Sequence, residues 1–397
     1  MDLKSGTLFW PEVNREMRRH SPLRKDIKCE VAIIGAGLTG ALIAYSLVEA
    51  GFDVVLVDKR DVGQGSTSAS TALILYEIDT PLSELISLIG RRKAERGYRI
   101  CRDAIFEIER IVNALKDDCG FAAMRSVYLA STRGDVAKLK KECRARARAG
   151  FNVEYLAAGE LRERFGLAAH GAILSSEAAV IDPYRFCNCL VESSSSRGLR
   201  VFGRTEIDHF DVRKQRVILH AGRRQITARK VVVAAGYESA AFLKKIPVRL
   251  KSTYAIATEP VKDWAHRDLL IWEMARPYIY LRVTSDGRIL IGGEDENFRD
   301  PKRRDRLIPS TTRRLETKLS RLFPGLRTKT AYAWAGTFAE TKDGLPYIDT
   351  VPGQPHVMYA LCYGANGTNF AIIAAKMICD WVRGKPNADR PIFSFER

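Results

Sequence analysis

The sequence has few histidines and no cysteine pair with a metal-binding spacing. Its 397 residues include 6 histidines and 8 cysteines, and the closest cysteines, Cys187 and Cys189, lack the CxxC spacing of zinc or redox sites. We therefore expect no metal site, and free, buried thiols in a reducing compartment. Internal repeats and low-complexity segments are also missing, so we expect a globular protein with two interleaved domains.

Long hydrophobic segments are nearly absent as well. Only residues 31–48 lack charged side chains over a length that could cross a membrane. Glycines interrupt this segment, and Gly51 and the β-branched residues that follow favour a soluble α/β unit. The first 20 residues lack the apolar core of a signal peptide. We therefore expect a cytoplasmic protein without a transmembrane segment.

Acidic residues are too few to balance the basic ones. The 64 Lys and Arg against 47 Asp and Glu give a net charge of +17, which favours an anionic partner: cofactor phosphates, an acidic substrate, a membrane surface or nucleic acid. The basic runs at 91–96, 138–148 and 302–306 lack the interleaved aromatics of a nucleic-acid stacking surface. We interpret them as solvated helix faces and rank nucleic acid below a small-molecule partner.

The most informative segment is residues 30–58, EVAIIGAGLTGALIAYSLVEAGFDVVLVD. It reads as strand, glycine turn, helix and a second strand ending in Asp58. Gly35 permits the tight turn, Gly37 lets the backbone approach a pyrophosphate, and Gly40 lets the helix lie close to the strand. The helix N-terminus then directs its amides at the phosphates, and Asp58 binds ribose hydroxyls. This pattern predicts a dinucleotide-binding βαβ unit, with Thr39, Lys59 and Arg60 also contacting the cofactor.

Further elements follow from hydrophobic periodicity and turn residues. A buried strand ending in Gly236 returns to the nucleotide sheet, and alternating residues predict a hairpin around Ser285, Asp286 and Gly287 in a mostly antiparallel sheet. The other expected elements are a helix over about 81–116, a strand at 126–131, a basic helix around 138–148, a helix after Asp182 and Pro183, a strand at 357–361 and a helix over about 368–383.

Four motifs in this order resemble the D-amino-acid oxidase, glycine oxidase and sarcosine oxidase family of FAD-dependent oxidoreductases, over nearly the whole chain. They are GAGLTG at 35–40, the serine-rich loop at 63–71, VVVAAG at 231–236, and the paired segments at 334–349 and 363–381. The resemblance implies an α/β fold with two domains. A Rossmann-like FAD-binding domain would comprise 1–85, 155–240 and 330–397, and a mostly antiparallel substrate-binding domain 86–154 and 241–329.

The resemblance also assigns residues to FAD. Hydroxyls of the serine-rich loop would bind the pyrophosphate and the flavin edge, with a plain surface turn as the alternative. The glycine loop at 364–368 would stabilise negative charge on reduced flavin through a helix N-terminus, with an ordinary helix cap as the alternative. Gly336 replaces the cysteine that tethers flavin in monomeric sarcosine oxidases, so we expect non-covalent FAD. The residues assigned in this way are Ser66, Thr67, Ser68, Thr71, Gly236, Gly336, Gly364, Asn366, Gly367 and Thr368.

The expected substrate end departs from the family. The positions where relatives grip a substrate carboxylate hold Ala72, Leu75, Thr337 and Phe338. We therefore expect the substrate amine to be bound by acidic or aromatic groups, and the catalytic candidates are Tyr278, Glu77, Tyr254 and Tyr76, with Asp79 and Tyr280 nearby. Core packing is the alternative for each tyrosine, and an exposed or salt-bridged carboxylate is the alternative for Glu77. If the substrate is a zwitterion, Arg282 or Arg249 would bind its carboxylate.

The resemblance implies oxidation of a C–N bond in a small amine or amino acid by hydride transfer to FAD, giving an imine that hydrolyses. Leu290 stands where sarcosine oxidases carry an oxygen-activating lysine, which leaves the electron acceptor open between O2 and a quinone or carrier protein. Three alternatives also stay open: a flavoenzyme acting on a tRNA base side chain, a polyol-phosphate dehydrogenase, and a non-catalytic flavin-binding subunit. NAD(P) is not expected as the tightly bound redox cofactor.

Overall fold

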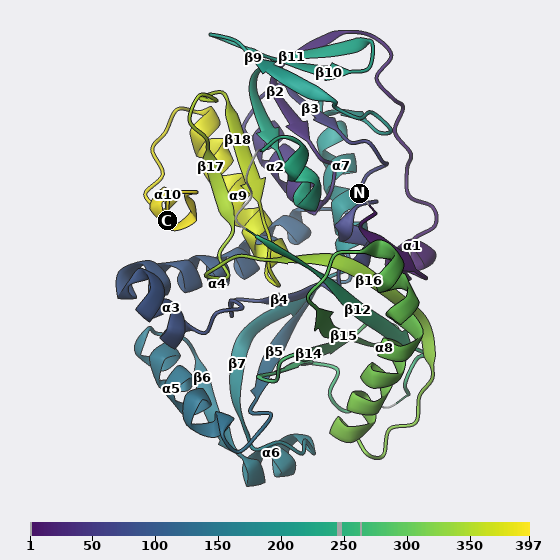
Figure 1. Cartoon of the computed structure of the whole chain (residues 1–397), viewed down its shortest axis with the longest axis vertical. Coiled ribbons are helices and arrows are strands. Elements are labelled where there is room, and N and C mark those ends of the chain that lie inside the picture. Colours follow the sequence, from purple (N-terminus) through teal and green to yellow (C-terminus); the bar gives the residue numbers. More distant parts are fainter. Residues whose placement is uncertain (1, 244–247, 263) are drawn as a thin grey trace.

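Two large sheets organise the chain (Figure 1). The computed structural model describes residues 2–243, 248–262 and 264–397. The part of the predicted substrate range 241–329 that falls at 244–247 and 263 lies outside the described residues. An eight-stranded sheet lies in the upper half of Figure 1 and a ten-stranded sheet in the lower half. The mixed α/β fold predicted from the sequence is confirmed.

The eight-stranded sheet has a parallel centre. Strands β3, β2, β11 and β18 lie side by side in the order β17-β18-β11-β2-β3-β8, with β17 antiparallel to β18 and the β9–β10 hairpin attached to β11. The central strands are buried on both faces, which explains their continuous apolar runs. The bounds are β2 (Ile27–Ile34), β3 (Val54–Val57), β8 (Arg200–Phe202), β9 (His209–Val212), β10 (Val217–Ala221), β11 (Arg224–Val233), β17 (Tyr347–Thr350) and β18 (Val357–Leu361).

Helices α2 (Leu38–Glu49), α7 (Pro183–Ser195) and α9 (Gly367–Val382) pack together beside this sheet, and α4 (Arg91–Ala114) packs against α9. Helix α7 begins as predicted, because the Asp182 carboxylate accepts hydrogen bonds from the amides of Tyr184 and Arg185. The single helix expected over 81–116 is instead two helices, α3 (Leu82–Ile89) and α4. They are separated by Gly90, whose φ of +82° lies outside helical geometry.

The ten-stranded sheet is mostly antiparallel, in the order β1-β16-β12-β15-β14-β13-β5-β7-β4 with β6 on β7. The predicted hairpin is confirmed as β14 (Ile279–Val283) and β15 (Ile289–Glu296), and helix α8 (Pro301–Leu322) packs on β12, β15 and β16. The other strands are β1 (Lys4–Gly6), β4 (Leu73–Leu75), β5 (Ala122–Leu129), β6 (Val153–Ala157), β7 (Gly171–Val180), β12 (Arg249–Thr258), β13 (Leu269–Glu273) and β16 (Thr330–Glu340). The remaining helices are α1 (Phe9–Val13), α5 (Asp135–Arg148), α6 (Ala158–Phe165), α10 (Arg390–Phe393) and the short 3-10 helices η1 (Ser66–Ala69) and η2 (Gly236–Ala241).

Sheet membership differs from the expected domain ranges at four strands. Strands β1, β4, β7 and β16 fall within the ranges expected for the FAD-binding domain, yet all four belong to the ten-stranded sheet. They do so because β7 pairs with β4 and β5, and β16 pairs with β1 and β12. The chain therefore crosses between the two sheets more often than the sequence motifs indicated.

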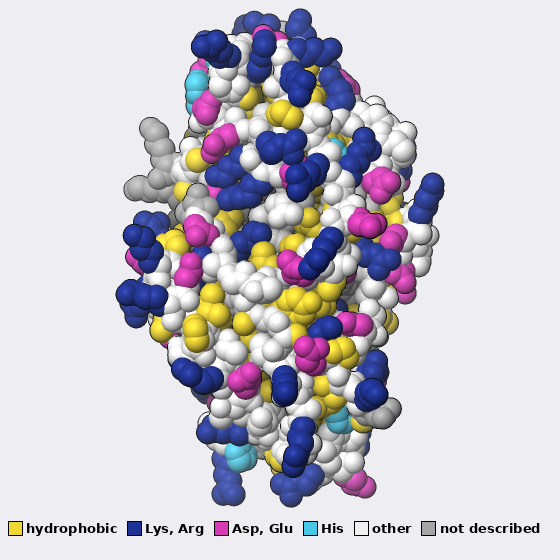
Figure 2. Space-filling view, turned by 90° about the vertical axis from the view of Figure 1, so that its right-hand side faces the viewer, with side chains coloured by type: hydrophobic (Ala, Val, Ile, Leu, Met, Phe, Trp, Pro, Cys, Tyr) yellow, Lys and Arg dark blue, Asp and Glu magenta, His cyan; other side chains and the backbone are white. Residues whose placement is uncertain are grey.

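The face drawn in Figure 2 carries many basic side chains without a single basic block. Figure 2 shows Lys and Arg side chains spread over one whole face, with Asp and Glu between them. Residues 31–48, the candidate span, divide into the end of β2, the glycine turn and most of α2. Among the described residues, no helix has the length and apolar character needed to cross a membrane.

Candidate active site

One cavity of about 340 Å³ collects the residues that the sequence assigned to a dinucleotide. Both sheets contribute to its wall: the carboxyl ends of β2 and β3 on one side, and residues of β12, β14 and β16 on the other. Fifteen of the seventeen predicted cofactor residues line it: Gly35, Gly37, Thr39, Asp58, Lys59, Arg60, Ser66, Thr67, Thr71, Gly236, Gly336, Gly364, Asn366, Gly367 and Thr368.

The two remaining predicted residues lie behind the wall. A Cβ at Gly40 would lie 1.8 Å from the Gly35 carbonyl oxygen, so this glycine permits the close approach of α2 to the turn, as the fingerprint predicts. Ser68 is buried, and its hydroxyl donates to the Gly65 carbonyl at 2.9 Å. Ser68 therefore does not line the cavity, and the loop itself uses the proton of its hydroxyl.

The glycine turn after β2 leaves room for a phosphate. Gly35 has a φ of +110°, which favours glycine, and a Cβ at Gly37 would lie 3.2 Å from Thr67 Oγ1. The Asp58 carboxylate at the end of β3 accepts hydrogen bonds from the amides of Ala36 and Arg60, each at 2.7 Å. Burial raises the pKa of Asp58, although the hydrogen bonds from these two amides act to lower it. The acid is thus fixed at the turn, where a ribose would lie.

Two cations and an acid border the same end of the cavity. Lys59 and Arg60 contact Glu238 at 2.8 and 2.7 Å. Burial opposes ionisation of Glu238, but hydrogen bonds from Arg60 and Lys59 outweigh it and lower the pKa of Glu238 to about 2. The Glu238 carboxylate is therefore ionised at neutral pH, and its two basic partners border the expected adenosine end.

The serine-rich loop is held from behind by two tryptophans. Trp10 Nε1 donates to the Ser70 carbonyl at 2.6 Å, and Trp334 Nε1 donates to the Ala69 carbonyl at 2.9 Å. The Thr67 hydroxyl accepts the amide of Leu38 in the first turn of α2 at 3.0 Å. This loop is therefore an anchored part of the cavity wall, which disfavours the alternative of a plain surface turn.

The glycine loop before α9 forms the opposite wall. The Asn366 side chain donates to the carbonyls of Leu75 and Glu77 at 2.6 and 2.9 Å, while its buried Oδ1 finds no partner in the described parts of the chain. Two helix N-termini, those of α2 and α9, thus border one cavity that also has an unpaired buried oxygen. This donor set fits FAD: the N-terminus of α2 would hold the pyrophosphate, and the N-terminus of α9 would stabilise negative charge on the flavin.

The far end of the cavity carries the candidate substrate groups. Tyr278, a predicted catalytic residue, lines it together with Tyr280, Asp79 and the family positions Ala72, Leu75, Thr337 and Phe338. Among the further lining residues that the sequence interpretation missed are Thr253, Trp272 and Arg276. Arg276 directly precedes Pro277 and Tyr278 in the sequence, and this adjacency was the signal that could have identified it.

Among the described residues that line this end, Arg276 is a cation that is left for a ligand. Its guanidinium lies 4.9 Å from the centre of the Tyr278 ring, and no carboxylate of the described residues pairs with it. Burial raises the pKa of Asp79, and the Ala365 amide and Arg276 act against that rise. The cavity therefore offers a cation, an acid and phenol groups within one chamber.

A second acid lies behind this chamber. Burial raises the pKa of Asp295 to about 6, although hydrogen bonding from Thr253 opposes the rise. Burial also raises the pKa of Tyr280 to about 12, so its phenol is neutral at pH 7. Proton-bearing groups thus surround this end of the cavity.

The Glu77 carboxylate takes part in a buried ion network. Its Oε1 pairs with Arg146 at 3.2 Å, both side chains are fully buried, and Arg146 also binds Glu142 at 2.7 Å. Glu77 is among the residues that line the cavity, but this network engages its carboxylate. The geometry therefore favours the salt-bridge alternative over the prediction that Glu77 binds the substrate ammonium.

Tyr76 and Tyr254 are also core residues rather than cavity residues. Tyr76 stacks on Phe151 at 4.7 Å and accepts a hydrogen bond from Ser175 at 2.8 Å. Tyr254 alternates along β12 with Thr253, so its ring enters the core on the opposite face of the strand. Neither residue lines the cavity, and their assignment as catalytic residues is corrected accordingly.

The two alternative arginines are excluded as well. Arg282 is buried and donates to the carbonyls of Ala72 and Ile181 at 2.9 and 2.8 Å. Burial lowers the pKa of Arg282 to about 9. Arg249 is exposed and does not line the cavity.

Known proteins are similar to this chain in sequence and fold. Residues 30–381 match the family model described as FAD dependent oxidoreductase, DAO. Glycine oxidase from Bacillus licheniformis is 24% identical over 90% of this chain and 94% of its own, and gamma-glutamylputrescine oxidoreductase from Escherichia coli (strain K12) is 25% identical over 91% and 85%. The crystal structure of glycine oxidase from Geobacillus kaustophilus superposes with a TM-score of 0.80 at 19% identity, covering 93% of this chain and 99% of that one. The chain therefore belongs to the DAO family of FAD-dependent oxidoreductases, and FAD is its cofactor.

Proposed function

We propose that this enzyme oxidises the C–N bond of a small amino acid or carboxylated amine, giving an imine that hydrolyses to a carbonyl compound and an amine. The observation that carries the proposal is Arg276, an unpaired cation among the described residues, in the chamber that continues from the FAD cradle. Relatives named for glycine and gamma-glutamylputrescine support this substrate class.

Bound FAD supplies the hydride acceptor. The chain's own residues then have three tasks. Arg276 binds the substrate carboxylate, and because the cation lies over Tyr278, the two side chains hold one end of the substrate in a fixed orientation. The apolar wall around Ala72, Leu75 and Phe338 excludes water from the C–N bond.

Asp79 is the candidate base that accepts the proton of the substrate amine. Only a neutral amine gives up hydride readily, so the ammonium form of the substrate must lose a proton first. Asp79 lines the chamber and has a raised pKa because it is buried, so it accepts a proton more readily than an exposed aspartate. This role replaces the one first assigned to Glu77.

Anaerobic flavin bleaching with a panel of amines, amino acids, a polyol phosphate and a tRNA tests the proposal. We expect carboxylated amines to bleach the flavin. Arg276→Met should raise KM for the best substrate roughly 10- to 100-fold, the value of a charge-assisted hydrogen bond of about 1.5 to 3 kcal/mol. Arg249→Met is the matched control and should leave KM unchanged. Bleaching only by the polyol phosphate or the tRNA would overturn the proposal in favour of those alternatives.

A further inference from the structure

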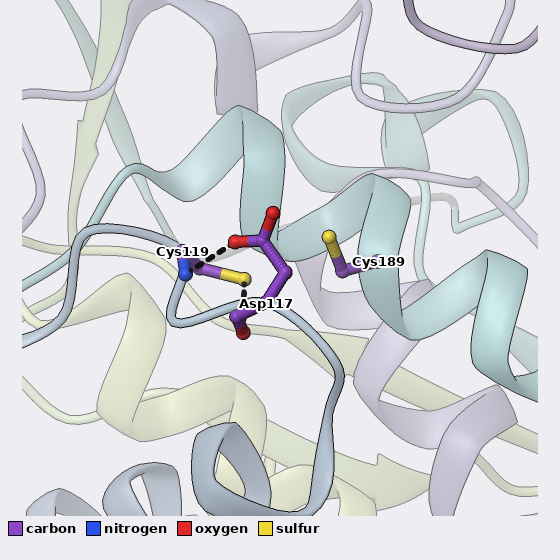
Figure 3. Close-up of side chains that lie close together, drawn as sticks. All are labelled: Asp117, Cys119 and Cys189. Atoms are coloured by element: carbon purple, nitrogen blue, oxygen red, sulfur yellow. Dashed lines mark hydrogen bonds between the residues drawn. The ribbon is translucent and has the colours of Figure 1, made fainter.

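A second group of reactive side chains lies outside the cavity. Cys119, in the loop between α4 and β5, and Cys189, on α7, lie beside Asp117, with the two sulfurs and a carboxylate oxygen all within 4.8 Å of one another (Figure 3). The cysteines are 70 positions apart in the sequence, so their spacing gave no sign of a pair. The interpretation of all eight cysteines as isolated buried thiols missed this contact.

The two thiols have unequal chemistry. Cys119 is buried and Cys189 is partly exposed. A hydrogen bond with Cys119 lowers the pKa of Cys189, with Arg185 contributing in the same direction, whereas the same hydrogen bond and burial raise the pKa of Cys119. The pair therefore consists of an accessible sulfur that ionises readily and a buried sulfur that keeps its proton, the two roles of attacking and resolving thiols.

A metal ion fits this cluster less well than oxidation does. Both Asp117 oxygens are already engaged: Oδ1 accepts the Cys119 amide at 2.6 Å, and Oδ2 accepts Arg185 Nε and an Arg185 terminal nitrogen at 2.9 and 2.7 Å. A cation would have to displace the guanidinium. The same guanidinium stabilises a thiolate, so the local charge favours a reactive cysteine.

We propose that Cys119 and Cys189 are a redox pair that hydrogen peroxide converts to a disulfide. The Cys189 thiolate attacks one peroxide oxygen, the O–O bond breaks, and hydroxide leaves, giving a sulfenic acid. The Cys119 sulfur then attacks the Cys189 sulfur, the S–O bond breaks, and the Cys119 proton leaves with the hydroxyl group as water. In sum, two thiols lose two electrons and two protons, and peroxide becomes two water molecules.

The disulfide would tie a loop to the helix that supports the cofactor cradle. The Cys119 carbonyl already accepts the Asp182 amide at 2.8 Å at the start of α7. From this helix, Pro183 lines the cavity, and the Tyr184 hydroxyl accepts a hydrogen bond at 2.7 Å from Nε2 of Gln64 in the serine-rich loop. Closing the sulfurs to a bond of about 2.05 Å requires Cys119 Sγ to leave the Asp117 carbonyl, which it contacts at 3.5 Å. Cross-linking should therefore stiffen the wall and raise the Tm.

The test treats the FAD-loaded protein with a few equivalents of hydrogen peroxide, followed by intact-mass measurement and peptide mapping. We expect the mass of two hydrogen atoms to be lost, a Cys119–Cys189 linked peptide, a higher Tm, and reversal of all three by dithiothreitol. The half-buried Cys379 on α9 gives the matched control, because Cys379→Ser should still form the linked peptide.

Variants separate the two roles. Under peroxide and dimedone, Cys119→Ser should accumulate the sulfenic acid adduct on Cys189, and Cys189→Ser should give no adduct on Cys119. The peptide map of the unmutated protein remains decisive if either variant fails to fold. Peroxide that links other cysteines, or leaves both thiols free, would overturn the proposal. Protein isolated with one equivalent of zinc that shields both thiols until it is chelated would overturn it in favour of a metal site.

Discussion

The substitution Glu77→Gln tests the interpretation of the substrate end most directly. If Glu77 bound the substrate amine, the change would lower turnover by two orders of magnitude. The Glu77 carboxylate instead faces Arg146 in a fully buried network with Glu142, whose oxygens also accept the amides of Leu82 and Ser83 at 2.9 and 2.8 Å. We therefore expect Glu77→Gln to lower stability and to change kcat and KM by less than about 3-fold.

The size of the stability effect follows from the contacts. Breaking a buried ion pair completely costs about 3 to 5 kcal/mol. Because Arg146 keeps its 2.7 Å contact with Glu142 in the variant, we expect roughly half of that cost, about 2 kcal/mol. With an unfolding entropy of about 2.1 cal/mol/K for each of 397 residues, the Tm should fall by about 2 to 3 °C. Arg146→Met leaves both acids unpaired, so its Tm should fall by about twice as much.

The assay combines calorimetry with the bleaching rate on the best substrate of the panel. Tyr76 is near the same network but does not line the cavity, so Tyr76→Phe serves as a control that should leave the bleaching rate unchanged. A 100-fold loss of kcat/KM in Glu77→Gln without a change in Tm would refute the reasoning, since it would mean that the carboxylate reaches the substrate.

Three further outcomes are expected. Acid precipitation should release all the yellow colour into the supernatant, because Gly336 offers no tethering thiol, and colour in the pellet would contradict non-covalent FAD. Gly37→Val should lose FAD, since the added side chain would enter the space beside Thr67 Oγ1; a full flavin spectrum in this variant would argue against the cradle. Burial raises the pKa of Asp295 from 3.8 to about 6, so the stability that it contributes is present below pH 4 and lost as the pH rises through 6. The free energy of unfolding of Asp295→Asn in urea should therefore exceed that of the unmutated protein by up to about 3 kcal/mol at pH 7. The two values should converge near pH 4. Equal stability of the two proteins at both pH values would refute the pKa shift.

The sequence by itself determined the cofactor and most of the predicted residues that line the cavity. Local chemistry explains this agreement: Gly35 and Gly37 are required by the turn itself, and Asp58 follows at a distance set by one helix and one strand. The serine-rich and glycine loops are likewise short segments whose residues act together, so their place in the cavity wall could be inferred from the resemblance. The cavity wall also includes Thr39, Lys59 and Arg60, because these residues adjoin the motifs in the sequence.

Only the tertiary structure decided which side chains meet at the substrate end. On β12, adjacent residues point to opposite faces, and without the sheet register the sequence could not tell that Thr253 rather than Tyr254 faces the cavity. Glu77 lies close in sequence to the cavity residues, but its carboxylate pairs with Arg146, which is 69 positions away in the sequence.

The sequence also did not determine which sheet each strand joins or which distant side chains meet, and the physical reason is the same. Strand β7 has the pattern of a buried strand whichever sheet it joins, and pairing with β5 decides the matter. Cys119 and Cys189 become neighbours only when the loop after α4 packs on α7. Spacing along the chain records local backbone requirements, whereas contacts between distant segments depend on how the sheets and helices pack.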